Sequence, residues 1–453
     1  MHMLIAGTSY FPQYTAGTEV YIKLLATQLQ KTGHNATVAC GGDCTIPLAD
    51  SQKWGTETLT VEGVDVFRVV RNPAMAEISD HYGRTDKARH AVWIEIFERV
   101  KPDVVMVVGR SPAVMGDVEV IAKSRGVPVI WTLIHPDQVC PKGPRINWKG
   151  EGCMEAVTES RCSDCILRSL GAPWLVSTIS RFLRPARLDR FLSENRVSTC
   201  LKIPSLVGAY RDRWHEIQAS VDVFVAHSEA ARQLLLENGI GDPKILFSPP
   251  GFDSSDARIH RPSPATTPTN PVRFGFVGRL CAQKGVETLI DSWRKINATL
   301  DCELHFWGDP RYGDVSSVEA VKQIAQDDCR VRLRGGFSRQ ELSSVYGSMD
   351  VLVVPSEWFD NCPFVISEAF LFGVPVIGAD FGGISTMIQD GHNGWLFPMK
   401  DSSRLASIIE RLTNSPHRIR AVAANVQPPR EFVDHAAEVI KEASELVAMA
   451  DCR

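Results

Sequence analysis

The chain lacks the features that would place it across a membrane, on a nucleic acid or among two common nucleotide-binding families. Its 453 residues contain no run of 18 apolar residues, so no transmembrane helix is expected. A formal net charge of −4 gives no electrostatic reason to expect nucleic-acid binding. Neither a G-x-G-x-x-G fingerprint nor a G-x-x-x-x-G-K-[ST] loop occurs, which argues against a standard nicotinamide enzyme and a P-loop ATPase.

The N-terminus also lacks the pattern of a signal peptide. Its apolar stretch in MHMLIAGTSYFPQ is short and has no basic flank, so it predicts a first core strand and a cytoplasmic protein. Twelve cysteines are many for such a protein. Eight of them are scattered and are expected to be free thiols in a reducing cytosol: Cys40, Cys44, Cys200, Cys281, Cys302, Cys329, Cys362 and Cys452.

The sequence does contain predicted strands that alternate with predicted helices, in two halves of the chain. At 44% hydrophobic and 23% charged residues, a soluble protein of two or three domains is expected. Short β-branched runs alternate with amphipathic segments, which predicts parallel βαβ units. In the first half the predicted strands are Met3–Ala6, Thr37–Ala39, Val64–Val70, Val104–Val108, Val129–Leu133, Val221–Ala226 and Ile245–Phe247, with helices at Thr18–Thr32, Lys87–Val100, Val114–Arg125 and Glu229–Asn238.

A Pro-, Ser- and Thr-rich stretch separates the halves. We predict an N-terminal Rossmann-like domain over 1–250 with an insert at about 140–218, and a linker over 251–272. A C-terminal Rossmann-like domain over 273–430 and a final helix over 431–453 complete the expectation. The predicted fold class is α/β, with two doubly wound domains facing each other across a cleft; ligands bind beyond the carboxyl ends of such strands.

The segment PSEWFDNCPFVISEAFLFGVP places two carboxylates at the start of a helix. Asp360 and Glu368 are eight residues apart across a Cys-Pro turn. A carboxylate accepts two hydrogen bonds from a vicinal diol, so the pair indicates a site for a polyol such as ribose or a hexose.

A second segment, FGFVGRLCAQKG, carries two cations after a strand. Arg279 offers a forked donor and Lys284 a point charge, which together suit a diphosphate. A solvated loop is the alternative interpretation of the same residues.

Three C-terminal motifs occur in a recognisable order: VGRLCAQKGVETLI, then PSEWFDNCPFVISEAFLFGVPVI, then GGISTMIQDGHNGWLF. With the opening SYFPQYTAGTEVYIKLLATQLQKTGHNATVAC, the chain resembles the retaining GT-B glycosyltransferases of family 4 (glycosyl transferases group 1). The resemblance implies transfer of a sugar from a nucleotide-diphosphate donor to a glycan or lipid-linked acceptor, with retention of configuration. Neither a protein nucleophile nor a catalytic metal is implied, and cell-surface polysaccharide synthesis is the expected pathway.

The resemblance also implies roles for particular residues. Arg279 and Lys284 would bind the diphosphate, Glu368 the ribose, and Asp360 the sugar hydroxyls, with His135 near the donor sugar. Further binding positions are implied where backbone approaches the ligand: Gly17 in the first loop, Gly336 near the base, and Asn361, Cys362 and Phe364 before the helix.

Two residues depart from the family pattern. Asp360 stands where glutamate is usual, and Thr386 stands where many members carry a glutamate. These departures keep two rival functions open, a nucleotide-sugar epimerase of the same fold and a non-catalytic nucleotide-sugar-binding protein.

Four cysteines form a cluster of their own after His135. The spacing Cys140-x12-Cys153-x8-Cys162-x2-Cys165 suits tetrahedral thiolate ligation, so a structural zinc or an iron–sulfur cluster is predicted there. Free thiols and disulfides are the alternatives. Further on, residues 179–192 mix arginine with phenylalanine and leucine, which is typical of a membrane-surface helix or of a helix packed on its own domain.

Overall fold

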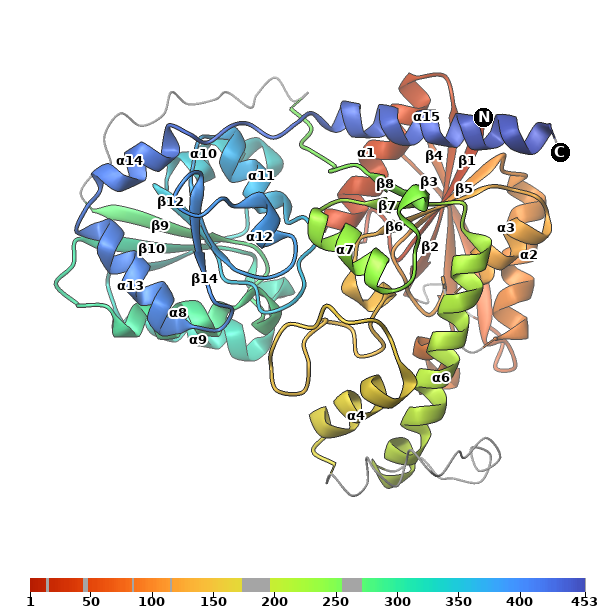
Figure 1. The fold of residues 1–453 in the computed structure, drawn as a ribbon, viewed down its shortest axis with the longest axis horizontal. Coiled ribbons are helices and arrows are strands. Elements are labelled where there is room, and N and C mark those ends of the chain that lie inside the picture. The colour runs from red at the N-terminus through yellow and green to blue at the C-terminus, as the bar shows by residue number, and fades with distance from the viewer. Residues whose placement is uncertain are drawn as a thin grey trace. The chain divides into compact units, whose positions relative to one another are not determined.

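The protein is described from a computed structural model. It covers residues 1–13, 16–43, 48–83, 85–114, 116–172, 196–254 and 271–452, with the backbone alone for 196–199. These residues form two compact units, one of Met1–Pro249 with His435–Arg453 and one of Pro250–Asp434, each built on its own sheet (Figure 1).

The described strands of the first unit form one sheet in the order β3-β4-β2-β1-β5-β6-β7-β8. All neighbouring pairs are parallel except β3 with β4. The strands are β1 (His2–Gly7), β2 (Asn35–Gly42), β3 (Trp54–Val61), β4 (Val64–Arg71), β5 (Val104–Val108), β6 (Val129–Leu133), β7 (Val223–Ala226) and β8 (Ile245–Phe247).

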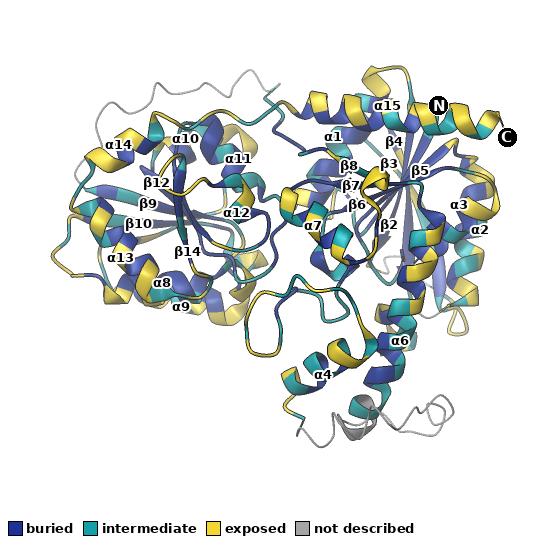
Figure 2. Cartoon of the chain, in the orientation of Figure 1, coloured by how far each residue is buried: buried dark blue, intermediate teal, exposed yellow. Residues whose placement is uncertain are grey.

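Strands buried on both faces are the ones that the sequence predicts best. Every residue of β5 and β6 is buried, and both strands begin and end where their β-branched runs do. The edge strand β3 was not predicted. Its residues WGTETLTV are largely polar, and most of them are partly or fully exposed (Figure 2). An antiparallel edge strand lacks the continuous apolar run that marks a central one.

The described helices of the first unit pack beside this sheet or, as α4 does on α6, on another helix. They are α1 (Gly17–Lys31), α2 (Lys87–Val100), α3 (Asp117–Ser124), α4 (Glu159–Ser169), α6 (Arg196–Ser220), α7 (Glu229–Glu237) and α15 (Phe432–Asp451). The predicted irregular insert contains a regular element, because α6 runs for 25 residues despite Pro204.

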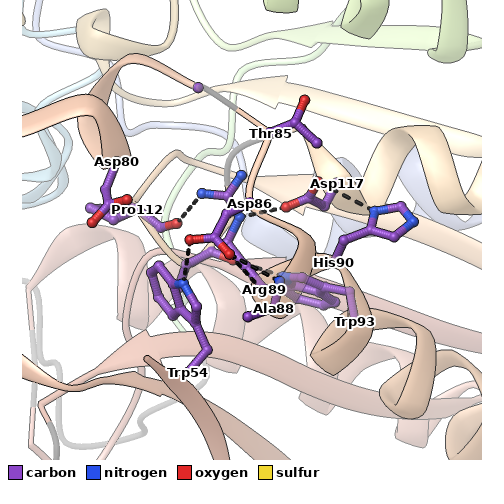
Figure 3. A network of polar contacts seen from close by, with 12 residues as sticks. Trp54, Asp80, Thr85, Asp86, Ala88, Arg89, His90, Trp93, Pro112 and Asp117 are labelled. Atoms are coloured by element: carbon purple, nitrogen blue, oxygen red, sulfur yellow. Dashed lines mark hydrogen bonds and ion pairs between the residues drawn. The ribbon is translucent and has the colours of Figure 1, made fainter. Parts of the chain in front are cut away.

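A buried polar network fixes α2 against the loop between β5 and α3 (Figure 3). The Arg89 guanidinium is fully buried, pairs with Asp117 and donates to the carbonyl of Pro112 at 3.0 Å. Asp86 caps α2 and accepts from the Trp54 indole at 2.9 Å. The loop at the carboxyl end of β5 is therefore held to α2 by the Arg89 guanidinium.

The final helix belongs to the first unit although the second unit precedes it in the chain. His435, on α15, forms two hydrogen bonds through its imidazole: Nε2 lies 2.8 Å from Tyr21 Oη, and Nδ1 lies 2.7 Å from Ser248 Oγ. All three residues are buried. The sequence composition alone does not show that the last helix packs on the first unit.

The second unit is a parallel sheet in the order β11-β10-β9-β12-β13-β14. Alternate residues of β12 face two different apolar clusters, Val351 and Val353 one and Leu352 and Val354 the other. The sheet is therefore buried on both faces. The strands are β9 (Val272–Val277), β10 (Cys302–Trp307), β11 (Val331–Gly335), β12 (Val351–Val354), β13 (Val376–Ala379) and β14 (Gly394–Phe397).

The described helices of the second unit follow these strands. They are α8 (Val286–Lys295), α9 (Val315–Asp327), α10 (Leu342–Gly347), α11 (Phe364–Leu371), α12 (Ile384–Met387), α13 (Ser402–Thr413) and α14 (His417–Ala423). The predicted α/β class with two Rossmann-like domains is confirmed. Across the described part of the chain, no helix has the length and apolarity needed to span a membrane. The segment 179–192 lies outside the described residues, and the predicted domain boundaries stay predictions.

Candidate active site

The candidate site of the second unit lies at the carboxyl edge of its sheet. Three loops leave this edge: residues 278–285 after β9, 355–363 after β12 and 380–383 after β13. The strands are parallel neighbours in the order β9-β12-β13, so their following loops emerge side by side. The sequence places its candidate cations and carboxylates in the first two of these loops.

Gly285 allows the first two loops to touch. It has φ of 72°, and a Cβ atom there would stand 1.9 Å from the carbonyl oxygen of Pro355. Beside it, the Glu357 amide donates to the carbonyl of Gln283 at 2.9 Å. A residue without Cβ is therefore required for both the backbone conformation and the contact.

Lys284 and Asp360 meet at this contact. The Lys284 ammonium lies 2.5 Å from Asp360 Oδ2. The same oxygen accepts from Ser356 Oγ and from the Trp358 indole, each at 3.3 Å. The Asp360 side chain is 10% exposed and that of Lys284 is 23% exposed, so the pair is mostly withdrawn from water.

The third loop fixes the backbone of Asp360 and Asn361. The amide of Gly383 donates to the carbonyl of Asp360 at 2.8 Å. A Cβ on Gly383 would stand 1.4 Å from the carbonyl oxygen of Asn361. Thr386 turns its hydroxyl back to the carbonyl of Gly383 at 2.8 Å, so it closes its own helical turn.

Glu368 lies on α11 and is only partly exposed. Its Oε2 accepts from the Tyr346 hydroxyl at 2.6 Å. Burial raises the pKa of Glu368, while the Tyr346 hydrogen bond and the charge of Arg339 lower it. Tyr346 is itself fully buried and stacks on Phe372 with ring centroids 5.5 Å apart. Glu368 thus sits on a rigid support.

The remaining predicted residues of this unit occupy the same edge without joining that cluster. Arg279 is exposed, and its side chain makes no hydrogen bond or ion pair with another described residue. Gly336 follows β11, where a Cβ would lie 3.1 Å from Cβ of Asp309 in the loop after β10. Arg279 is thus a cation held by no carboxylate in the described structure.

Cys362 and Phe364 flank the start of α11. Burial raises the pKa of Cys362 to about 12, with the charge of Asp360 acting in the same direction, so the thiol is neutral at physiological pH. Its Sγ lies 3.9 Å from the sulfur of Met387. Phe364 is the first residue of the helix, after Pro363. A side-chain thiolate role for Cys362 is therefore unsupported, and the prediction for it concerns only its backbone.

In the first unit, the structure brings the loop before α1 together with the turn after β6. Gly17 is exposed at the start of α1, and the next residue, Thr18, lies with Oγ1 2.7 Å from Nε2 of His135. The His135 amide donates to Gln138 Oε1 at 2.9 Å, which holds the turn that carries the imidazole.

Two residues beside His135 were missed by the sequence reasoning. Asp137 has a buried Oδ1 with no hydrogen-bond partner among the described residues. Burial raises the pKa of Asp137, and the charges of His135 and Arg110 lower it. The Arg110 guanidinium lies 3.9 Å from the ring centroid of Tyr210 and donates to the carbonyl of Asp137 at 3.0 Å. The only signal in the sequence is position, since both residues lie in the loops that follow buried strands.

The four clustered cysteines lie in the same unit, just beyond this turn. Cys140, Cys153, Cys162 and Cys165 are free thiols of intermediate exposure. In the described part of the chain, no group of three or more His, Cys, Asp and Glu side chains is already arranged to hold a metal ion.

Comparisons with solved structures define the fold. The chain resembles HepE of Anabaena, solved in complex with UDP-glucose, with a TM-score of 0.61 and 17% identity over 98% of this chain and 100% of that one. Sucrose-phosphate synthase of Thermosynechococcus elongatus gives a TM-score of 0.61 and 17% identity over 99% and 100%. The chain therefore has the two-domain α/β fold of GT-B glycosyltransferases.

Comparisons of sequence point to the same class, and the family match lies in the second unit. Residues 271–415 match the family described as "Glycosyl transferases group 1". The "D-inositol 3-phosphate glycosyltransferase" of Stackebrandtia nassauensis is 27% identical over 241 residues, covering 49% of this chain and 52% of that protein. The "Amylovoran biosynthesis glycosyltransferase AmsK" of Erwinia amylovora is 29% identical over 177 residues, covering 37% and 42%. The matches thus span about half or less of these curated relatives.

Proposed function

We propose that the protein is a retaining glycosyltransferase that moves a sugar from a nucleotide-diphosphate sugar to a glycan or lipid-linked acceptor. Synthesis of cell-surface polysaccharide is the setting we favour, because a relative named for amylovoran biosynthesis matches this chain. The observation that carries the proposal is the meeting of Lys284 and Asp360 at the carboxyl edge of the second sheet, within the segment that matches group 1 glycosyltransferases.

The donor would bind along the three loops of this edge. Lys284, and Arg279 with no carboxylate partner in the described structure, supply the positive charge that a diphosphate requires. As the bond to the sugar breaks, negative charge grows on the diphosphate, and fixed cations in a partly desolvated site stabilise it most. In this proposal the two side chains do the work that a divalent cation does in other transferases.

The two carboxylates would hold the two sugars of the donor. Glu368, supported by Tyr346, accepts from the ribose hydroxyls. Asp360 receives all three of its side-chain contacts on Oδ2, so we assign Oδ1 to a hydroxyl of the transferred sugar. Asp360 would also hold the Lys284 ammonium in place. Aspartate can therefore replace the usual glutamate at this position, because Asp360 Oδ2 already contacts the Lys284 ammonium.

Two residues of the first unit are also given roles in this proposal. His135, oriented by Thr18 and Gln138, is proposed to contact the donor sugar, and Gly17 to let the first loop approach the phosphates. Transfer would then proceed by positioning and charge stabilisation.

Nucleotide release from a panel of UDP-, GDP- and ADP-sugars tests the proposal. A transferase should release the nucleotide slowly from one donor without acceptor, and Glu368→Ala and Asp360→Ala should each slow that release. Conversion of the sugar while it stays attached to its nucleotide would instead identify an epimerase. Tight binding without any turnover, with acceptor extracts added, would identify a binding protein.

A further inference from the structure

The four clustered cysteines lie on two pieces of chain that the structure packs together. Cys140 and Cys153 bracket a hairpin-like loop in which Ile146 bridges Gly152 and the Cys153 amide donates to the carbonyl of Arg145 at 2.7 Å. Cys162 and Cys165 are three residues apart on α4, so their side chains share one face of the helix.

Contacts across the two pieces bring this face to the loop. The Arg168 guanidinium lies 4.7 Å from the ring centroid of Trp148, and the Cys165 thiol interacts with the Trp148 backbone. Arg168 is three residues beyond Cys165 on α4, so the contact of Arg168 with Trp148 lays the cysteine-bearing part of the helix against the loop that Cys140 and Cys153 bracket.

The loop has little else to hold it. Between Pro141 and Thr158 it has no regular helix or strand, and most of its residues are not buried. Its order comes from cations that donate to carbonyl groups. The Lys142 ammonium donates to Ile146 at 3.0 Å, and Arg145 donates to Val139 at 2.9 Å and to Glu155 at 2.8 Å.

Those cations lack a counter-charge. Arg145 is 2% exposed, its Nε has no hydrogen-bond partner, and neither it nor Lys142 forms an ion pair with a described carboxylate. A buried guanidinium without an anion is costly. Four thiolates around one Zn²⁺ form a dianion, and such a centre would balance the two cations.

We propose that Cys140, Cys153, Cys162 and Cys165 bind one zinc ion that ties the loop to α4. The four thiols are not already in ligand positions in the described structure, and zinc binding would require their deprotonation. Because the loop and α4 are in contact through Trp148 and Arg168, zinc binding would draw the four cysteine side chains together. The zinc would be structural, with all four positions filled by protein.

Zinc binding at the four cysteines would also affect the turn that carries His135. Cys140 is two residues beyond Gln138, which receives the His135 amide, and Arg145 holds the intervening Val139. A zinc at the cysteines would therefore fix the end of this turn, as a positioning device and not as a participant in transfer.

Metal analysis of the full chain, purified without added metal or chelator, tests the proposal. About one zinc per chain is expected, as in other four-thiolate sites. The variants Cys162→Ser and Cys165→Ser should lose it, whereas Cys329→Ser, an exposed cysteine of the other unit, should keep it. Replacement by Co²⁺ should give the strong near-ultraviolet absorption of thiolate ligation.

Because the cysteine variants could lose zinc simply by failing to fold, a second experiment uses the unsubstituted protein. With zinc bound, the four thiols should resist a thiol reagent until a strong chelator is added, and chelation should lower the midpoint of thermal unfolding. Metal-free protein with these thiols reactive from the start, or joined as disulfides, overturns the site. Iron with acid-labile sulfide in place of zinc overturns the assignment of the metal.

Discussion

The Lys284 ammonium lies 2.5 Å from Asp360 Oδ2, although 76 residues separate them in the chain. They meet because neighbouring parallel strands, β9 and β12, deliver their loops to one edge of the second sheet. Gly285 makes the approach possible by leaving room for the carbonyl of Pro355. One short ion pair thus joins the proposed diphosphate-binding loop to the proposed sugar-binding loop.

Removing the charge of Asp360 should harm catalysis more than it harms the fold. Asp360→Asn keeps the shape and loses the ion pair, so we expect a loss of at least tenfold in kcat/KM, the equivalent of about 1.4 kcal/mol or more. Asp350→Asn is the matched control, because Asp350 pairs with Arg273 at 3.0 Å at the opposite edge of the same sheet. Chemical unfolding should show similar losses of stability for both variants, whereas steady-state kinetics should show a large effect of Asp360→Asn only. Equal kinetic effects would contradict the assignment.

Two glycine variants can distinguish the effect of the close contact at Gly285 from the effect of its positive φ. Gly285 and Gly373 share φ of 72°, but a Cβ would meet Pro355 at Gly285 and no atom within 4 Å at Gly373. Alanine at Gly373 should therefore cost only the conformational strain, about 1–2 kcal/mol of unfolding free energy. Alanine at Gly285 should cost more and should also abolish donor turnover. Similar stabilities of the two variants would show that the loops do not need this contact.

The pH dependence of donor binding should report on Glu368. Its pKa is raised by burial, and the ionised form is the one that accepts hydrogen bonds from a ribose diol, so nucleotide affinity should increase as pH rises through this raised pKa. Tyr346→Phe removes a hydrogen bond that lowers the pKa while it keeps the stacking on Phe372, so the transition should move to higher pH. Calorimetric titration with the nucleoside diphosphate measures this. A transition that does not move in Tyr346→Phe would place Glu368 outside the ribose site.

The stability of the first unit should decrease in mild acid because of His227. Burial lowers the pKa of His227 well below 6.5, and nearby His435 acts in the same direction. The folded state then keeps the imidazole neutral while the unfolded state takes up a proton below pH 6.5, so stability is lost as pH falls. Between about pH 7.5 and about pH 5.5 the loss approaches about 1.4 kcal/mol for this group. His227→Gln should remove that part of the slope, and His417→Gln, at an exposed histidine, should not.

The buried elements and the charged motifs could be predicted from the sequence because each rests on a local pattern. The β5 and β12 strands are continuous apolar runs, and Lys284 and Asp360 lie in the loops that follow the buried strands β9 and β12. The direct pairing of Lys284 with Asp360 was not predicted. It depends on the order of strands in the sheet, which local patterns do not encode.

Other features were missed for related reasons. The edge strand β3 alternates polar residues on an exposed face, and the return of α15 to the first unit depends on contacts of His435 with residues more than 180 positions away. The sequence also could not predict that Asp137 Oδ1 is buried without a hydrogen-bond partner among the described residues, because burial is defined only by the folded chain. The roles given to Gly17, Gly336 and His135 stay predictions.

Titration of the full chain with nucleotide-diphosphate sugars tests the central claim most directly. The account predicts that one donor binds with a stoichiometry of about one per chain, as a single site requires. Its affinity should fall at least tenfold in Lys284→Met, Asp360→Asn and Glu368→Gln, and should be unchanged in Asp350→Asn. Donor binding that survives all three substitutions at full strength, or no binding of any nucleotide sugar, would contradict it.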